Sequence, residues 1–263
     1  RFNRERFDDF VWENDKIAHR TYGKALETWK GEPLTSSTID IWSKRTPRMV
    51  VNDWYLADDY HVDHGEGADF YSAGLSRGCG GSGIWAADKL WVSGNFVKSN
   101  VLANGPIRVM FELEYAPYEV NVAQLTEVKR VTLDAGSQLD FYQSRWKLNE
   151  LGDLPTAVGL KKVKGEQLMK GDTWLAKWEP MEKKAGNQGL ALIVPPGAMD
   201  QSLDSGLDHL VVMKPAKGEA KWWAGFCWDK AGEITTADEW RSHVVRFTEK
   251  LAAPIQVSVD PSK

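Results

Sequence analysis

The 263-residue chain has few cysteines, no excess of basic residues and no long apolar run. Its two cysteines, Cys79 and Cys227, are too few for a disulfide-based scaffold and do not make a zinc signature on their own. The formal net charge of -4 gives no basic balance that would point to nucleic acid as a partner. No apolar run approaches the roughly 20 residues that a membrane-spanning helix needs. The chain begins at Arg1 without a signal-peptide pattern, so we expect a processed or trimmed form whose N-terminus does not reveal its compartment.

Tryptophan, in contrast, is abundant, with 13 in the chain. An indole ring buries a large apolar area and keeps one N–H donor, so a large aromatic core is one interpretation. The other is a groove in which indole rings stack on the apolar faces of sugars. Composition does not distinguish between these two uses.

The middle of the chain carries a period-two pattern. From Ile107 to Tyr115, apolar or aromatic residues at the odd-numbered positions alternate with Arg108, Met110, Glu112 and Glu114, which predicts a strand with one buried face. Similar short runs, bounded by Gly, Pro, Asp or Lys, are Glu127–Asp134, Leu139–Leu148, Thr156–Leu160, Trp174–Trp178, Leu190–Val194, His209–Met213 and Trp222–Trp228. Many strands joined by short turns favour an all-β antiparallel sandwich or barrel, and we expect one domain over residues 1–263.

One helix is predicted near the C-terminus. Thr236 and Glu239 have the spacing of a capping box. Trp240, Val244 and Phe247 then repeat at helical spacing.

The stretch from Tyr60 to Gly83 mixes titratable residues with glycines and reads as an ordered functional loop. It holds His61, His64 and Arg77 as well as several carboxylates. Such mixtures of acids and bases are typical of sites with perturbed pKa values. The alternative is a structural loop whose histidines satisfy backbone groups.

Five segments together resemble a known bacterial domain family. They are WENDKIAHRTYG at 12–23, DYHVDHGEGADFY at 59–71, SRGCGGSGIW at 76–85, VLANGPIRVMFELEY at 101–115 and EVKRVTLDAGSQL at 127–139. The family, formerly of unknown function, is encoded in gene clusters that degrade acidic plant and algal polysaccharides. The last two segments are also similar to galactose-mutarotase-type proteins.

This resemblance implies an antiparallel β-supersandwich and an activity on acidic oligosaccharides. A family member in ulvan degradation is an oligosaccharide dehydratase, a carbon–oxygen lyase that removes water from a uronic acid at the non-reducing end and leaves a 4,5-unsaturated uronyl residue. The resemblance further implies a periplasmic or secreted location. Fold similarity alone is weak support for the reaction, because such folds carry many functions.

Dehydration of a uronic acid removes the C5 proton and expels the C4 hydroxyl, so it needs a base, an acid and a group that neutralises the carboxylate. Histidine suits proton transfer near neutral pH, which makes His64 and His61 candidates. Tyr60 could assist if a cation lowers its pKa. If residues 60–64 are extended, Tyr60 and His64 share one face, so we predict these two as the proton-transfer pair.

Arginine presents a planar fork that fits a carboxylate, and we predict Arg77 as the clamp. Arg20, beside His19 on a strand-like run, is a second candidate, with a structural ion pair as the alternative. We also expect substrate contacts from His19, Arg145 and Trp85.

A metal is a further alternative, because His61, Asp63, His64 and Glu66 form an H-x-D-H-x-E pattern. Zn²⁺ or Ca²⁺ would accept such ligands, although the spacing matches no zinc signature and the dehydratase hypothesis requires no metal. Three other functions stay open. A polysaccharide lyase has the same chemical demands, a mutarotase-like enzyme needs acid and base only, and a non-catalytic carbohydrate-binding domain needs neither.

Overall fold

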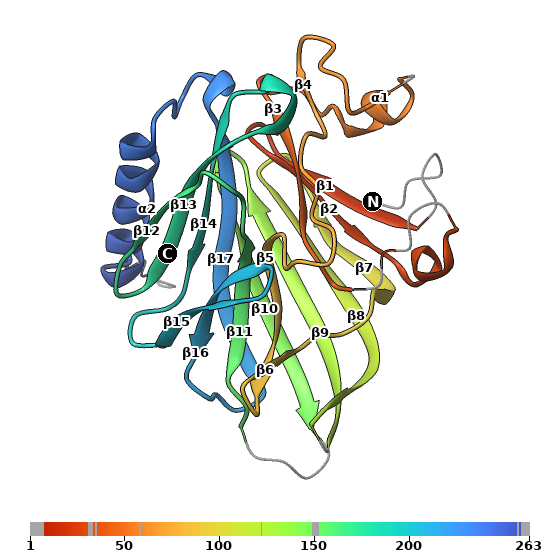
Figure 1. Cartoon of the computed structure of the whole chain (residues 1–263), viewed down its shortest axis with the longest axis vertical. Helices are drawn as coiled ribbons and strands as arrows, with labels where there is room; N and C mark the ends of the chain where they lie inside the picture. Colours follow the sequence, from red (N-terminus) through yellow and green to blue (C-terminus); the bar gives the residue numbers. More distant parts are fainter. Residues whose placement is uncertain are drawn as a thin grey trace, which may run out of the picture.

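Antiparallel β-sheets form most of the protein in the computed structural model, which describes residues 8–30, 34, 36–57, 59–121, 123–148, 153–256 and 258. Within these residues there are three sheets (Figure 1). The largest has the order β12-β13-β14-β17-β10-β9-β8-β7. Its strands are β7 (Phe96–Asn104), β8 (Arg108–Val120), β9 (Ala123–Asp134), β10 (Leu139–Leu148), β12 (Gln167–Lys170), β13 (Trp174–Pro180), β14 (Asn187–Ile193) and β17 (Glu219–Trp228).

A second sheet, of order β15-β16-β11-β5-β6, packs against the inner face of the first. Its strands are β5 (Cys79–Ala86), β6 (Lys89–Trp91), β11 (Thr156–Lys161), β15 (Met199–Ser205) and β16 (Asp208–Met213). Phe111 and Tyr142 from the large sheet share one buried cluster with Val158 and Val211 from this one. Side chains from two facing sheets that fill one core define a β-sandwich.

The third sheet has the order β1-β2-β3-β4. Its strands are β1 (Asp9–Glu13), β2 (Ala18–Tyr22), β3 (Asp40–Lys44) and β4 (Gly67–Ala68). Its inner face carries Phe10, Trp12 and Ile41 into the main core. Its outer face carries Ala18 and Trp42 into a separate cluster.

The one-turn helix α1 (Val51–Tyr55) covers that outer face. Trp54 of α1 stacks on Trp42 of β3, with ring centroids 5.9 Å apart. Tyr60 stacks on the same indole, with centroids 5.3 Å apart. The segment after α1 therefore lies over the small sheet.

The predicted C-terminal helix is confirmed as α2 (Ala237–Ala252), which lies alongside β13 and β14 (Figure 1). Thr236 Oγ1 accepts the Glu239 N–H at 3.2 Å, and the Glu239 carboxylate in turn accepts the Thr236 N–H at 3.2 Å. Gly189 lets the helix pack closely, because a Cβ there would come within 2.5 Å of the Trp240 ring. The capping box and this contact fix where the helix begins and which face it buries.

The sequence-based fold class, an all-β antiparallel sandwich with a C-terminal helix, is confirmed. Most tryptophans belong to buried clusters, as in the core interpretation, and Trp29 is an exposed exception. Cys79 and Cys227 are both buried free thiols. Among the described residues, no helix is long and apolar enough to cross a membrane.

Candidate functional site

The candidate site lies on the outer face of the small sheet, where β2 and β3 present charged side chains. Residues of a strand alternate between its two faces. Arg20 and Tyr22 of β2 therefore point to the outer face together with Asp40 of β3, which is the register partner of Arg20. All three are buried, so this charge lies beneath other parts of the chain.

Arg20 is surrounded by three aspartates. Its Nε lies 3.0 Å from Asp40 Oδ2, and its Nη2 donates to the same oxygen. Nη2 also lies 2.9 Å from Asp69 Oδ2, and Nη1 lies 3.7 Å from Asp9 Oδ2. One guanidinium thus faces three carboxylates from β1, β3 and the segment after β4.

Tyrosine hydroxyls complete this network as hydrogen-bond donors. Tyr22 donates to Asp40 Oδ2 at 2.8 Å, and Tyr55 donates to Asp9 Oδ2 at 2.7 Å. Burial raises the pKa of Tyr22 well above its usual value, and it does the same for the pKa of Tyr71 nearby. Burial acts to lower the pKa of Arg20, but its tyrosine and aspartate neighbours raise that pKa well above its ordinary value. Near neutral pH the arginine is charged and these tyrosines keep their protons.

His61 is the accessible titratable group beside this cluster. Its Nδ1 lies 3.0 Å from the Asp69 carbonyl oxygen and 3.6 Å from Asp69 Oδ2. Its side chain is 44 % exposed, whereas that of Asp69 is fully buried. A histidine whose ring is oriented by a backbone oxygen and a carboxylate can exchange protons with a bound molecule.

These groups line a small hollow, which we call the Arg20 pocket. Its volume is about 190 Å³. Pockets for drug-sized ligands have volumes of roughly 300–1,000 Å³, so this smaller hollow suits one group of about monosaccharide size. Its polar lining residues are Arg20, Tyr22, Asp40, His61, Asp69, Tyr71, Ser72, Glu182 and Lys183.

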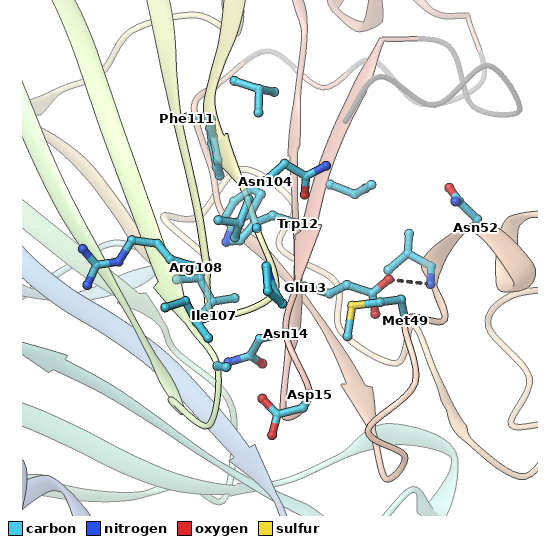
Figure 2. Close-up of a pocket in the computed structure, with 18 of the residues that line it drawn as sticks. Trp12, Glu13, Asn14, Asp15, Met49, Asn52, Asn104, Ile107, Arg108 and Phe111 are labelled. Carbon is cyan, nitrogen blue, oxygen red and sulfur yellow. Dashed lines mark hydrogen bonds between the residues drawn. The ribbon is translucent and has the colours of Figure 1, made fainter.

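A larger groove of about 740 Å³ lies between β1 and the β7–β8 turn (Figure 2). Its charged residues have partners. Glu13 pairs with Lys44 at 3.0 Å and accepts the Val51 N–H, while Arg108 pairs with Asp134. The described lining contains no histidine, tyrosine or lysine. Its larger volume favours this groove as the functional site, but the presence of groups that can transfer protons favours the Arg20 pocket.

The predicted proton-transfer pair of Tyr60 and His64 is not assembled. Residues 60–64 form turns and bends and no strand, so the alternation that would place both on one face does not apply. His64 is exposed, with Nε2 3.2 Å from the Asp59 carbonyl oxygen, and does not line the pocket. The Tyr60 ring instead packs against Trp42, with its centroid 5.9 Å from the Arg20 guanidinium.

Arg77, the predicted carboxylate clamp, lies inside the sandwich. It is 2 % exposed, and its Nη2 donates to Ser36 Oγ at 2.8 Å. Its backbone N–H is held by Asp208 Oδ1 at 2.8 Å. Arg77 therefore does not meet His64 or line the pocket, and its position is that of a residue that organises the interior.

Three predicted substrate contacts also lie elsewhere. His19 faces the core, stacked on Trp12 with ring centroids 5.3 Å apart, because it alternates with Arg20. Arg145 is on the outer face of the large sheet and pairs with Glu112 at 2.7 Å. Trp85 packs on the outer side of the five-stranded sheet. Of the predicted site residues, Arg20 and His61 line the pocket together, and Tyr60 lies beside them without lining it, with its ring centroid 4.3 Å from that of His61.

The H-x-D-H-x-E pattern does not converge on a common point. Asp63 and Glu66 pair with Arg45 and Arg48 respectively, at 2.5 and 3.0 Å. His61 and His64 contact different backbone oxygens. Within the described part of the chain, no group of three or more His, Cys, Asp or Glu side chains is placed to hold a metal ion.

The sequence analysis missed Asp40 and Tyr71 and did not assign Asp69 a role in the site. A signal for Asp40 was present, because a carboxylate within the apolar run Ile39–Trp42 is unusual for a buried strand and calls for a partner. Tyr71 lies within the loop predicted to be functional but was not assigned a role, whereas Lys183 had no local signal, because the chain brings it to the pocket from a distant segment.

Comparisons with known proteins give a family and distant structural likenesses. A family model described as "Domain of unknown function (DUF4861)" matches residues 1–257. A Formosa agariphila protein described as "Uncharacterized protein P7" is 33 % identical over 277 residues, covering 98 % of this chain and 69 % of that protein.

Two solved structures match the chain at a distance. A human-microbiome chain whose description names kojibiose phosphorylase matches with a TM-score of 0.47 and 8 % identity, over 94 % of this chain and 33 % of its own length. A Geobacillus stearothermophilus GH36 alpha-galactosidase, in complex with raffinose, matches with a TM-score of 0.35 and 10 % identity. This match covers 89 % of the chain and 43 % of the galactosidase, so the chain spans less than half of either protein. Likenesses this distant do not bear on the reaction.

Proposed function

The chain belongs to the DUF4861 family, and we propose that it is a carbohydrate-active enzyme that transfers protons in the Arg20 pocket. The observation that carries this proposal is the placement of His61. Its ring is accessible, is oriented by Asp69, and lines a polar hollow together with Arg20. The motif resemblance to a family from acidic-polysaccharide gene clusters supports a sugar as the substrate.

The reaction that we propose is dehydration of a non-reducing-end uronic acid. His61 takes the C5 proton, and the electron pair of the broken C5–H bond forms the C4–C5 double bond as the C4–O bond breaks. The protonated His61 then gives that proton to the departing oxygen, which leaves as water, and the imidazole returns to its neutral state. Tyr71 lines the pocket, and its hydroxyl has no hydrogen-bond partner among the described residues. Because burial raises its pKa, this hydroxyl stays protonated and can donate a hydrogen bond to the departing oxygen.

The small volume of the pocket fits this assignment. One terminal sugar would enter it, and the rest of the oligosaccharide would lie outside. A lyase that cleaves within a chain needs room for sugars on both sides of the bond, which the Arg20 pocket alone does not provide.

A second candidate function is favoured by the charge of the pocket. Asp40 and Asp69, which line the pocket beside Arg20, suit the hydroxyls of a neutral sugar, because carboxylates accept hydrogen bonds from hydroxyl groups. A mutarotase-like proton transfer on a neutral sugar needs an acid and a base and no carboxylate clamp. This alternative uses the same His61 with a different substrate.

One experiment separates these reactions. The protein is incubated with saturated uronyl oligosaccharides, and the ultraviolet absorbance of an unsaturated uronate is followed together with product masses. A dehydratase gives the chromophore and the loss of one water. A lyase gives the chromophore and shorter products, and a mutarotase gives neither but speeds the change in optical rotation of a free sugar. The absence of both chromophore and water loss would reject the dehydratase.

A further inference from the structure

One wall of the Arg20 pocket is a segment that belongs to no helix or strand. Six consecutive residues, Asp69 to Gly74, line the hollow. Tyr71, the proposed hydrogen-bond donor to the departing oxygen, lies near the middle of this wall. A segment outside the hydrogen-bonded ladders of a sheet opens easily unless other contacts hold it. The position of Tyr71 therefore depends on what supports the wall.

Lys161, which does not itself line the pocket, contacts this wall at two points. Its ammonium group donates a hydrogen bond to the Ser72 carbonyl oxygen and lies over the Tyr71 ring, 5.7 Å from its centroid. Among the described residues, this is the one hydrogen bond made by the backbone of residues 70–72. A hydrogen bond from a charged donor is stronger than one from a neutral donor, and an aromatic face attracts a cation. One side chain thus holds both the backbone and the ring of the wall.

The backbone of Lys161 is itself fixed by two sheets. Lys161 is the last residue of β11, and its N–H donates to the Gly78 carbonyl oxygen at 2.9 Å. Its own carbonyl oxygen accepts a hydrogen bond from Lys177 Nζ of β13. Lys177 is buried and pairs with Glu166 at 2.9 Å. The side chain of Lys161 therefore starts from a fixed point of the sandwich and extends to the wall.

Tyr71 has a second support, which leaves its hydroxyl available. Its ring packs in the main core cluster, and its hydroxyl has no hydrogen-bond partner among the described residues. Core packing holds the ring, whereas Lys161 holds the main chain that carries it. A displacement of about 1 Å in a group that acts on the transition state can cost about 100-fold in rate. Support of the main chain should therefore affect the rate.

We infer that Lys161 is a positioning residue, which directs the Tyr71 hydroxyl to the departing oxygen by holding the wall of the Arg20 pocket. This inference rests on the proposed function, because it concerns the donor in that reaction. Lys161 does not touch the substrate, and the hydrogen bond from Tyr71 strengthens as charge develops on the departing oxygen. Loss of Lys161 should therefore lower kcat and leave KM nearly unchanged.

The test compares three variants with the wild type. Lys161→Met keeps the apolar stem but loses the charge and the donor, whereas Lys161→Arg keeps both. Lys162→Met is the matched control, because the neighbouring ammonium contacts the β15–β16 turn, with Lys162 Nζ 3.4 Å from Asp204 Oδ2. Hydrogen exchange followed by mass spectrometry measures the order of residues 69–76 without any substrate. The absorbance assay with uronyl oligosaccharides measures kcat and KM.

In Lys161→Met we expect the amides of residues 69–76 to exchange about tenfold faster, while those of β9 and β10 keep the wild-type rates. Its kcat should fall about tenfold, with KM within about twofold of the wild type. Lys161→Arg should recover most of both losses, and Lys162→Met should match the wild type. Because Lys161 acts through Tyr71, adding Lys161→Met to Tyr71→Phe should not lower kcat further.

The outcomes separate this inference from the proposed reaction. If the wild type does not dehydrate uronyl oligosaccharides, but residues 69–76 exchange faster in Lys161→Met alone, the reaction is rejected and the support of the wall by Lys161 stands. Unchanged exchange of this segment in Lys161→Met overturns the inference, and so does an equal increase in Lys162→Met. Additive losses of kcat in the double variant also overturn it, because Lys161 would then act independently of Tyr71.

Discussion

His19 of β2 and Asp140 of β10 meet inside the sandwich, with His19 Nδ1 3.3 Å from Asp140 Oδ2 and both side chains fully buried. Burial lowers the pKa of His19 to about 3 and raises that of Asp140 to about 8. Hydrogen bonds from Trp12 and Tyr142 to the carboxyl group oppose the second shift without cancelling it. Between these values both groups are neutral, so the pair links the small sheet to the large one without a buried charge.

The first prediction concerns the pH dependence of stability. Asp140 has an ordinary pKa of 3.8, so between about pH 4 and about pH 8 the folded chain holds a proton that the unfolded chain releases. Stability should therefore fall as the pH rises through this window, by up to about 1.4 kcal/mol per pH unit from this group. Asp140→Asn removes that slope. Its free energy of unfolding, relative to the wild type, should rise between about pH 5 and about pH 8 in denaturant titrations.

His19 makes stability depend on pH in the opposite direction, and this dependence is present in both the wild type and Asp140→Asn. Its ordinary pKa of 6.5 means that the unfolded chain binds the extra proton below that pH, so stability falls as the pH drops from about 6.5 towards 3. A difference between Asp140→Asn and the wild type that does not change with pH would show that Asp140 is ionised in the folded protein.

The second prediction concerns the proton-transfer group. His61→Gln keeps a polar side chain of similar length but cannot act as a base, so we expect turnover to fall by about 100-fold or more with folding intact. His243→Gln is the control, because His243 lies on α2, stacked on Trp240, and lines neither hollow. Circular dichroism and the absorbance assay give the two measurements. A loss in His64→Gln that matches the loss in His61→Gln would contradict the site described above.

The third prediction concerns the buried charge cluster. Arg20→Met leaves Asp9, Asp40 and Asp69 without their shared counter-charge, and losing one partner of such a cluster costs about 3–5 kcal/mol. The loss should be smaller at low pH, where the aspartates can take up protons, than at alkaline pH. Arg20→Lys keeps the positive charge but loses the planar guanidinium, so its stability should lie between that of Arg20→Met and that of the wild type. Equal stability of Arg20→Met and the wild type at alkaline pH would exclude a cluster of ionised aspartates.

The fourth prediction concerns the contact between the small sheet and the five-stranded sheet. Gly78 forms a bridge with Ile39, has a φ of 62°, and a Cβ there would lie 1.9 Å from the Ile39 carbonyl oxygen. Gly78→Ala should destabilise the protein by several kcal/mol, because backbone must move. Gly206 has a φ of 54° with nothing near its Cβ position, so Gly206→Ala should cost only about 1–2 kcal/mol for its conformation. Thermal unfolding compares the two, and equal losses would mean that the close approach is not what requires glycine.

Local patterns predicted much of the fold. The alternation in β8 and the capping box of α2 follow from neighbouring residues, and both are confirmed. Ile107 is an exception, since it continues the alternating pattern but is 76 % exposed just before β8 begins. Whether the apolar face of an alternating segment is buried depends on which sheet covers it, and the segment's own residues do not determine that.

The site was predictable only in part. Arg20 and His61 were chosen by chemical type, and the structure places both at the pocket. His19 could have been separated from Arg20 by the same alternation that identified their strand, because neighbours in a strand face opposite ways. The position of Arg77 and the presence of Lys183 in the pocket lining depend on contacts between segments more than 100 residues apart, such as Arg77 with Asp208.

β2 carries His19 into the core and Arg20 into the pocket at successive positions of one five-residue strand. The same strand therefore lines the pocket on one face and the core of the sandwich on the other, so the pocket cannot form unless the core is folded. Loss of catalysis on heating should coincide with cooperative melting of the whole protein. Enzymatic activity would then report directly on the fraction of molecules that are folded.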